Sequence, residues 1–473
     1  MAVPGSILDG SIPPWKQVVL LSWPTIVELL LQTAVNYVDT AMVGSIGVDA
    51  TAAVGVTMST IWLINGFMNA VGVGYSVLVA HSIGEGNFDQ AKKIIRQSVL
   101  ATVVVGLLLT ALVTLVVAPW LPVWMHADPV VIPMARSYLQ IIGMAYLFNV
   151  SLIVCSSILR CAGDTKTPMK FNIMTNLINV VGNYFLIYPT TQMTLFGHSF
   201  TLHRAGWGVS GAAAATAASI VFSGVSLMAV LFLRPAAYRI GLKEGFCPDR
   251  KIIKRAIALG TPAAMERVTI SLGQIAATAM ITGLGTMALS ANLLADTGEK
   301  LCYLPVYGFA TAGTTLVAQS LGAGKRELAV RYGRWCNRLG IGVMLVTSTI
   351  MFLCAAPIIG FFTDDGPTIL LAAKMLRIEA FAEPFLAVGV VLAGVLRGVR
   401  DTRWPFYISL AGMWVVRIPL SYVLIHVFGW GLEAIWGAMI IDWLVRAVLS
   451  YTRFCWQSRR WQQMGESGER VRS

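Results

Sequence analysis

The chain has 473 residues, of which 56% are hydrophobic and only 12% are charged, and its mean hydropathy is +0.71. Soluble domains carry about 25% charged residues, so this composition excludes an ordinary soluble protein and places most of the chain in lipid. The net charge of +12 would suggest nucleic-acid binding in a soluble protein, but here the basic residues gather in the connections between apolar segments, so the expected partner is the lipid bilayer and no nucleic acid.

Apolar segments long enough to cross a hydrocarbon core of about 30 Å as helices follow one another along the whole chain. The first has no basic n-region and no small-residue cleavage site, so Val18 to Val38 is expected to be a retained helix rather than a signal peptide. The predicted spans are 15–41, 51–80, 97–119, 130–158, 168–189, 206–233, 255–282, 287–320, 338–362, 370–396, 405–428 and 430–454.

The basic residues alternate between the two sides that these spans define. The positive-inside rule assigns the basic connections to the cytoplasm, so both termini are predicted to be cytoplasmic in a multi-pass protein of the plasma (inner) membrane. The basic group comprises Lys92, Lys93, Arg96, Arg160, Lys166, Lys170, the run Arg234 to Arg255, the run Lys325 to Arg338, Arg397, Arg400, Arg403 and the C-terminal tail. The intervening connections carry Asp49, Asp128, Asp364 and Asp365, with Arg204 as their one clear basic residue.

The seven cysteines show no CxxC pair and no metal-ligand spacing. We therefore expect neither a disulfide framework nor a zinc site, and we interpret the cysteines as reduced, structural thiols.

The two halves of the chain repeat each other at a nearly constant shift. Chance does not produce such a register, so the sequence indicates an internal duplication. At a shift of 238 residues, Pro24 falls on Pro262, Glu28 on Glu266, Gly47 on Gly285, and AHSIGEGNFDQA (80–91) on AQSLGAGKRELA (318–329). At a shift of 237, LRCAGDTKTP (159–168) falls on LRGVRDTRWP (396–405).

This duplication predicts an all-α integral membrane protein with twelve transmembrane helices in two pseudo-symmetric six-helix lobes. Each half has an even number of spans, so the halves form a parallel repeat about an axis along the membrane normal, with substrate bound between them. The predicted parts are a cytoplasmic N-terminus (1–14), an N-lobe (15–233), an inter-lobe linker (234–254), a C-lobe (255–454) and a basic tail (455–473).

The WP...VDTAMVG stretch at residues 23–44, the two LR...DT..P connections and the two AxSxGxG connections together resemble the multidrug and toxic compound extrusion family. The resemblance covers residues 15–455. It implies a twelve-helix exporter with a V-shaped central cleft, which expels amphipathic and often cationic drugs in exchange for protons or sodium.

The resemblance also implies a cation site in the N-lobe. The aspartate that the family carries on its first helix matches Asp39, and the asparagines of its fifth helix match Asn179 and Asn183. Some members have a second aspartate where this chain has Asn183, which leaves one carboxylate with amide oxygens for a proton or a sodium ion here. The alternative interpretation is that Asp39 only ends its helix at the outer interface.

Further acids of the C-lobe match the family or lie at mid-membrane depth. The family glutamate of the seventh helix corresponds to Glu266, a glutamate that a subset carries on the eighth helix corresponds to Glu299, and the tenth helix offers Glu379 and Glu383 where other members carry an aspartate. Glu28 and Asn149 are weaker candidates in the N-lobe.

Charges near the bilayer centre are costly unless paired or hydrated, so each is a functional hypothesis. At about 1.5 Å per residue, Glu266, Glu299, Arg417 and Asp442 fall in one layer. Arg417 is expected to pair with Asp442 or Glu299, and Arg446 to add a second bridge, which could be purely structural. An excess carboxylate, Glu266 or Glu299, would then take up a proton or attract a cationic drug.

The leading hypothesis is a monomeric secondary active multidrug antiporter that works by alternating access, with drugs or metabolites as substrates and a proton or sodium as coupling ion. The nearest alternative is a flippase of a lipid-linked precursor, which would need a large cationic cavity. An enzyme is not expected, because there is no HExxH, no GxSxG, no phosphate-cradling glycine loop and no soluble catalytic domain. No cofactor is expected besides the coupling ion.

Overall fold

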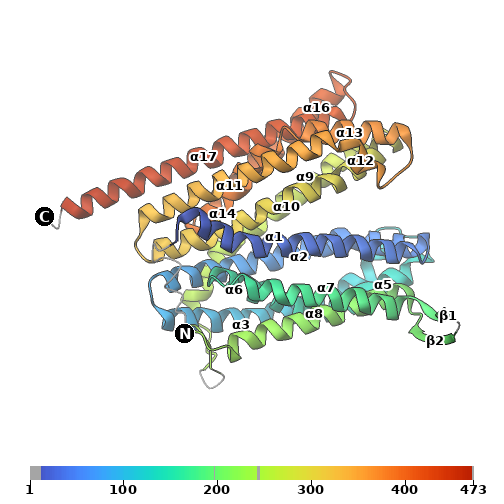
Figure 1. The fold of residues 1–473 in the computed structure, drawn as a ribbon, viewed down its shortest axis with the longest axis horizontal. Coiled ribbons are helices and arrows are strands. Elements are labelled where there is room, and N and C mark those ends of the chain that lie inside the picture. Colours follow the sequence, from blue (N-terminus) through green and yellow to red (C-terminus); the bar gives the residue numbers. More distant parts are fainter. Residues whose placement is uncertain (1–11, 196–197, 242–244, 471–473) are drawn as a thin grey trace.

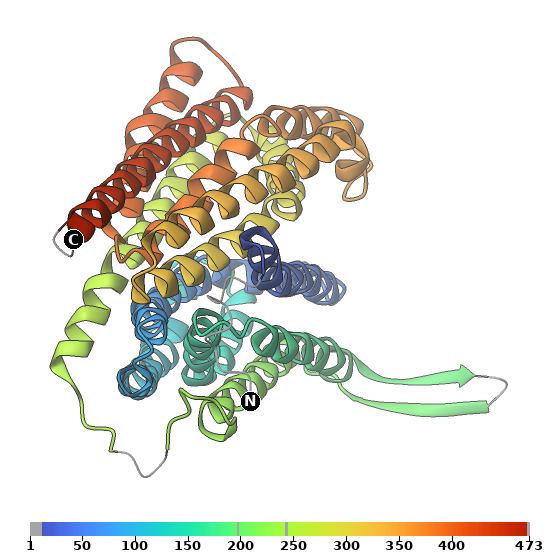
Figure 2. The ribbon, with the colours of Figure 1, turned by 60° about the vertical axis from the view of Figure 1, so that its left-hand side comes forward.

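The computed structural model describes residues 12–195, 198–241 and 245–470, and within them the chain is almost entirely helical. Figure 2 shows two helical bundles side by side, one formed by the N-terminal half (blue to green) and one by the C-terminal half (yellow to red). This arrangement confirms the predicted all-α fold of two lobes.

The N-terminal half contributes eight α-helices, a π-helical segment and a hairpin within the described residues. In chain order they are α1 (Pro14–Gly44), α2 (Val48–Gly84), α3 (Phe88–Leu112), the π-helical segment η2 (Val113–Val117), α4 (Ala118–Trp124), α5 (Val131–Met144), α6 (Tyr146–Cys161), α7 (Lys166–Ile187), β1 (Pro189–Leu195), β2 (His198–Ala205) and α8 (Gly208–Leu233).

The C-terminal half repeats this helical order. Its elements are α9 (Arg250–Thr282), α10 (Thr286–Gly322), α11 (Arg326–Leu353), α12 (Ala355–Gly360), α13 (Gly366–Glu379), α14 (Glu383–Gly398), α15 (Arg403–Leu410), the π-helical segment η3 (Ala411–Arg417), α16 (Ile418–His426) and α17 (Glu433–Arg470).

Eight helical segments in the described part of the chain are long and apolar enough to span a membrane, and two bent pairs bring the number to ten. The pairs α5–α6 and α13–α14 bend by 51° and 55°, and each is the fourth crossing of its lobe. The two remaining crossings are α7 and α9, whose hydropathy is lowered by polar residues such as Asn183 and Glu266.

Two features differ from the sequence-based expectation. The antiparallel hairpin β1–β2 was not predicted, and its backbone pairing runs from Pro189 opposite Ala205 to Leu195 opposite His198. The segment predicted as a C-terminal tail, 455–473, continues helix α17 as far as Arg470. Residues 471–473 of this tail, and residues 1–11 of the predicted N-terminal segment 1–14, lie outside the described residues.

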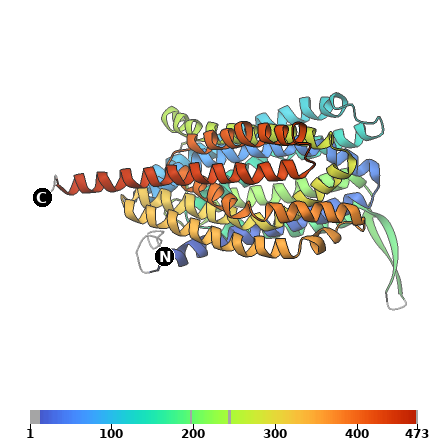
Figure 3. The ribbon, with the colours of Figure 1, turned by 90° about the horizontal axis from the view of Figure 1, so that it is seen from above.

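The long helices run roughly parallel, so the molecule has two distinct ends (Figure 1). The start of α1, the end of α17 and the connection between α8 and α9 lie at one end, and the hairpin lies at the other. Figure 3 shows α17 projecting beyond the bundle at the first end and the hairpin leaving it at the second.

The lobes meet where α2 crosses α10, and the two sides of this contact are related by the repeat. A Cβ at Gly84 would overlap the carbonyl oxygen of Gln319, and a Cβ at the equivalent Gly322 would overlap that of His81. Only glycine permits helix backbones to approach this closely. Ala80 and Ala318, also equivalent, are fully buried in a small core that they share with Cys161.

Candidate functional site

The first and fifth crossings of the N-lobe bring together Asp39, Asn179 and Asn183, as the sequence predicted, and the sixth adds Thr216. The Asn183 Nδ2 on α7 donates a hydrogen bond to Asp39 Oδ1 on α1 at 2.6 Å. With its amide nitrogen turned toward Asp39, Asn179 donates to both carboxylate oxygens, at 2.8 and 3.0 Å, while its oxygen accepts from Thr216 of α8. Both asparagines are buried and Asp39 is half-buried.

Asp39 does not end its helix, because α1 continues to Gly44. The interpretation of Asp39 as a helix-terminating residue at the interface therefore loses its structural basis. Its carboxylate instead lies at a three-helix contact in the last third of α1.

The oxygen atoms around Asp39 suit a small hard cation or a proton. The Asn183 Oδ1 is buried without a hydrogen-bond partner among the described residues, so it offers an acceptor next to the carboxylate. Carboxylate, amide and hydroxyl oxygens are the donors that hard cations prefer. These oxygen atoms could therefore bind a sodium ion that is transported, and the carboxylate of Asp39 could instead be protonated.

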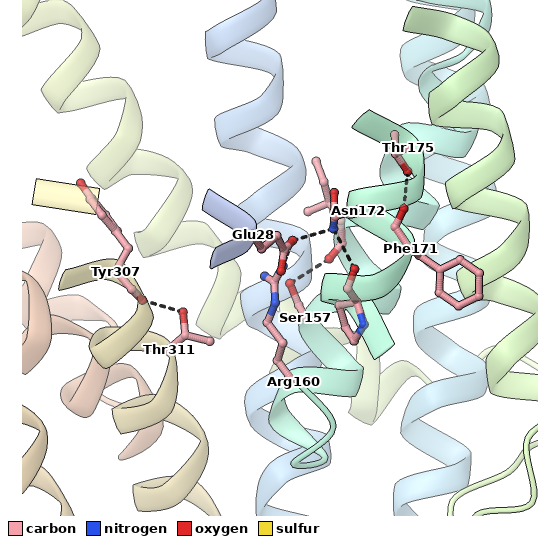
Figure 4. Close-up of polar contacts among 10 residues, drawn as sticks. Glu28, Ser157, Arg160, Phe171, Asn172, Thr175, Tyr307 and Thr311 are labelled. Carbon is pink, nitrogen blue, oxygen red and sulfur yellow. Dashed lines mark hydrogen bonds and ion pairs between the residues drawn. The ribbon is translucent and has the colours of Figure 1, made fainter. Parts of the chain in front are cut away.

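A second polar cluster joins Glu28, Arg160 and Asn172 (Figure 4). The Arg160 Nη2 lies 2.5 Å from Glu28 Oε1, and the Asn172 Nδ2 donates to the same oxygen at 2.6 Å. Glu28 is on α1, Arg160 is in the last turn of α6 and Asn172 is on α7. The figure shows Tyr307 and Thr311 of α10, in the other lobe, to one side of this cluster.

The C-lobe contains the equivalent cluster, which corrects the expectation for Glu266. Its carboxylate oxygens lie 2.8 and 3.0 Å from Arg397 Nη2, and Ser409 donates to it at 3.4 Å. The sequence placed Arg397 in a cytoplasmic connection and offered either Glu266 or Glu299 as the excess carboxylate. Arg397 is instead in the last turn of α14, from which its long side chain reaches back to Glu266.

The expected ion pair between Arg417 and Asp442 is present in the C-lobe. The Arg417 Nε lies 2.8 Å from one oxygen of Asp442, and Arg446 binds both oxygens, at 2.5 and 2.9 Å. The π-helical segment η3 carries Arg417 at its end, and π segments are frequent at functional sites. A Cβ at Gly412 would overlap this network, so the glycine makes room for it.

Three further acids of the C-lobe, Glu299, Glu379 and Glu383, are buried close to one another. Glu379 and Glu383 are fully buried, and none of their four carboxylate oxygens has a hydrogen-bond partner in the described part of the chain. Glu299 is 7% exposed and lies within electrostatic range of both, and of Arg417. Ionised carboxylates are costly in such positions, so this acidic cluster is suited to take up a proton or a cation.

The weaker candidate Asn149 does not join either acid cluster. Its Nδ2 donates to Asn65 Oδ1 of α2 at 3.2 Å.

Several side-chain hydrogen bonds join the lobes at the end where the chain termini lie, and two of them, which sequence analysis missed, are related by the repeat. The His81 Nε2 on α2 donates to the Gly398 carbonyl at 2.9 Å, and the Gln319 Nε2 on α10 donates to the Cys161 carbonyl at 2.8 Å. His81 and Gln319 are equivalent in the repeat, so the signal was present in the aligned AHSIGEG and AQSLGAG segments.

A family model described as MatE matches this chain twice, over residues 24–185 and 262–423, so its two matches are offset by the 238 residues of the repeat. Among curated proteins, the chain is 27% identical to the uncharacterized transporter YisQ of Bacillus subtilis, over 94% of each chain. It is 28% identical to a probable multidrug resistance protein NorM of Thermotoga maritima, over 95% of this chain and 93% of that protein.

Solved structures share the fold along the whole chain. A crystal structure of MATE in the straight conformation superposes with a TM-score of 0.89 at 22% identity and covers 98% of this chain. A transporter from Pyrococcus furiosus, described as a MOP superfamily member whose binding pocket has reverse polarity, superposes with a TM-score of 0.88 at 21% identity. At these identities the likeness concerns the fold alone.

Proposed function

Because the chain belongs to the MatE family, a family of membrane transporters and not of enzymes, we propose that it is a secondary active exporter of amphipathic drugs. In this proposal the export is driven by exchange for protons or sodium, and the two lobes alternate in opening to either side of the membrane. Several relatives are named as multidrug resistance proteins, which favours drug export over the flipping of a lipid-linked precursor.

The observation that carries the coupling proposal is the contact of Asp39 with Asn183 and Asn179 across α1 and α7. A carboxylate loses its charge when it takes up a proton and has that charge neutralised when it binds sodium, whereas an amide has no charge to lose or to neutralise. Occupation of this site therefore changes how strongly α1 and α7 attract each other. That difference is sufficient to bias the balance between two conformations of the transporter.

A second coupling position is proposed in the C-lobe, at the acidic cluster of Glu299, Glu379 and Glu383. Its support is the burial of carboxylate oxygens that lack hydrogen-bond donors. Glu28, Glu266 and Asp442 are less suited to this role, because each already binds at least one arginine. We assign these three acids to the architecture of their lobes.

The difference between the two ends of the molecule supports a proposal for its orientation in the membrane. We propose that the end with the chain termini faces the cytoplasm, because the basic connections and the α8–α9 linker lie there. The transporter is proposed to act as a monomer, with substrate bound between its lobes.

The test is to reconstitute Asp39→Asn and the parent protein into proteoliposomes at matched density and to measure drug flux under an imposed proton or sodium gradient. We expect Asp39→Asn to fold and insert normally, to bind drug, and to lose gradient-driven flux. Asp49→Asn is the matched control, since it removes an exposed acid at the start of α2. Parental flux by Asp39→Asn under both gradients would transfer the coupling role to the C-lobe acidic cluster.

A further inference from the structure

Arg267 is a charged residue in the middle of a membrane crossing that the transport proposal does not use. It lies on α9, about 25 Å along the helix from Arg250 and about 22 Å before the end at Thr282. The preceding Glu266 is bound by Arg397, whereas Arg267 has no hydrogen bond or ion pair within the described residues. Its side chain is exposed.

The side chain of Arg267 lies at the boundary between the lobes and not on an outer face of its own lobe. Its stem crosses Gly66 of α2, in the N-lobe, so closely that a Cβ at Gly66 would overlap Arg267 Cγ and come within 3.2 Å of Cδ. Glycine at this position therefore makes room for the arginine. Arg267 is also within electrostatic range of the hydroxyl of Tyr307 on α10.

One helical turn from Gly66, α2 presents an aromatic face at the same boundary. Trp62 is 59% exposed, and the Lys300 Nζ of α10 lies 5.6 Å from the centre of its ring. Trp62 and Lys300 are equivalent in the repeat, so their contact lies near the axis that relates the lobes. Lys300 is compensated by Asp296, 2.6 Å away, whereas no acid pairs with Arg267 in the described part of the chain.

An uncompensated guanidinium at mid-membrane depth is costly unless it faces water or an anionic ligand. Guanidinium groups bind carboxylates through two parallel hydrogen bonds, and exposed tryptophan offers a flat apolar surface to a ring. We propose that Arg267 and Trp62 form a binding site at the lobe boundary for aromatic compounds that carry a carboxylate, zwitterions included. This inference rests on the proposed function, because it specifies the chemical class of the exported substrate.

The probe pair is a rhodamine with a free carboxylate and the methyl ester of the same dye, titrated into the full-length protein in nanodiscs and followed by fluorescence polarisation. The parent protein is expected to bind the free carboxylate more tightly than the ester. Arg267→Gln should weaken binding of the carboxylate dye by at least about ten-fold, because at least one of the two charge-assisted hydrogen bonds is lost, and that of the ester much less. Arg267→Lys, which keeps the charge without the two-pronged geometry, should retain part of the preference.

Arg255→Gln, an exposed arginine twelve residues earlier on the same helix, is the matched control and should preserve the preference. Equal weakening of both dyes by Arg267→Gln, or no weakening of either, would overturn the inference. Gradient-driven efflux of the ester dye by the parent is measured separately in proteoliposomes. Its absence would count against the proposed function, whereas the equilibrium preference for the carboxylate would stand or fall independently.

Discussion

At the scale of single residues, each lobe holds a glutamate and an arginine in the same relationship. Glu28 and Arg160 in the N-lobe correspond to Glu266 and Arg397 in the C-lobe, and in both cases a polar side chain of the next crossing adds a hydrogen bond to the glutamate. Repetition of a buried pair after sequence divergence indicates that its loss is costly. Removing one partner of such a pair is costly because it leaves the other charge buried, away from water and without a counter-charge.

We expect Arg160→Gln to lower the free energy of unfolding by about 3 kcal/mol, since Glu28 is 5% exposed and would remain charged and buried. The double variant Glu28→Gln/Arg160→Gln removes both charges and should recover most of this loss. Thermal unfolding in detergent, monitored by circular dichroism, measures both. If the double variant is less stable than Arg160→Gln, the pair does not act through charge compensation.

At the scale of elements, α2 and α10 join the lobes through hydrogen bonds at the end where the chain termini lie. His81 and Gln319 each donate to a carbonyl of the opposite lobe, while at Trp62 and Lys300 the same two helices meet through an exposed tryptophan and a half-buried lysine. The close glycine contacts at Gly84 and Gly322 also lie at the closed end. Opening that end must therefore break a small, defined set of polar contacts.

His81→Leu should loosen the closed end, because the Gly398 carbonyl would lose its donor at a cost of about 1–3 kcal/mol. His81→Gln should not, because Gln319 makes the equivalent bond at the equivalent position. The buried Cys161, kept as the single cysteine, reports opening through its rate of alkylation by N-ethylmaleimide. Faster alkylation of His81→Leu alone is the expected result, and equal rates in all three proteins would contradict it.

The helices and the contact of Asp39 with its asparagines could be predicted from the sequence, because apolar length and the family motif identify them. The partner of Glu266 could not, because hydropathy places Arg397 at the end of a crossing and says nothing about where a long side chain reaches. The repeat makes Glu28 equivalent to Glu266 and Arg160 equivalent to Arg397. A predicted ion pair between Glu28 and Arg160 would therefore have implied the pair between Glu266 and Arg397. The hairpin β1–β2 could not be predicted, because the apolar segments that identify membrane-spanning helices say nothing about the structure of the connections between them.

At the scale of the whole molecule, the two ends differ in chemistry as well as in shape. The basic connections lie at the end with the termini, and the opposite end carries the hairpin. A chain with this asymmetry inserts in one orientation, because basic segments resist translocation.

The native Cys247 is exposed in the α8–α9 linker and provides a direct test of this orientation. As the single cysteine, it should react with an impermeant maleimide only in permeabilised cells. Thr191→Cys, on the exposed start of the hairpin in a background without other cysteines, should react in intact cells. Labelling of Cys247 from outside intact cells would reverse the proposed orientation.

The contact of Trp62 with Lys300 also bears on how a duplicated chain can arise. In a dimer of identical half-length chains, any residue on the symmetry axis would meet its own copy, so a lysine there would face a lysine. Alanine tolerates such a self-encounter, and Ala80 still lies with its equivalent Ala318 in one small buried core. A tryptophan opposite a lysine requires two copies of the half that can mutate separately, and this chain carries both copies. The two sides of the contact at the axis of this protein therefore carry different side chains, which no pair of identical subunits can have.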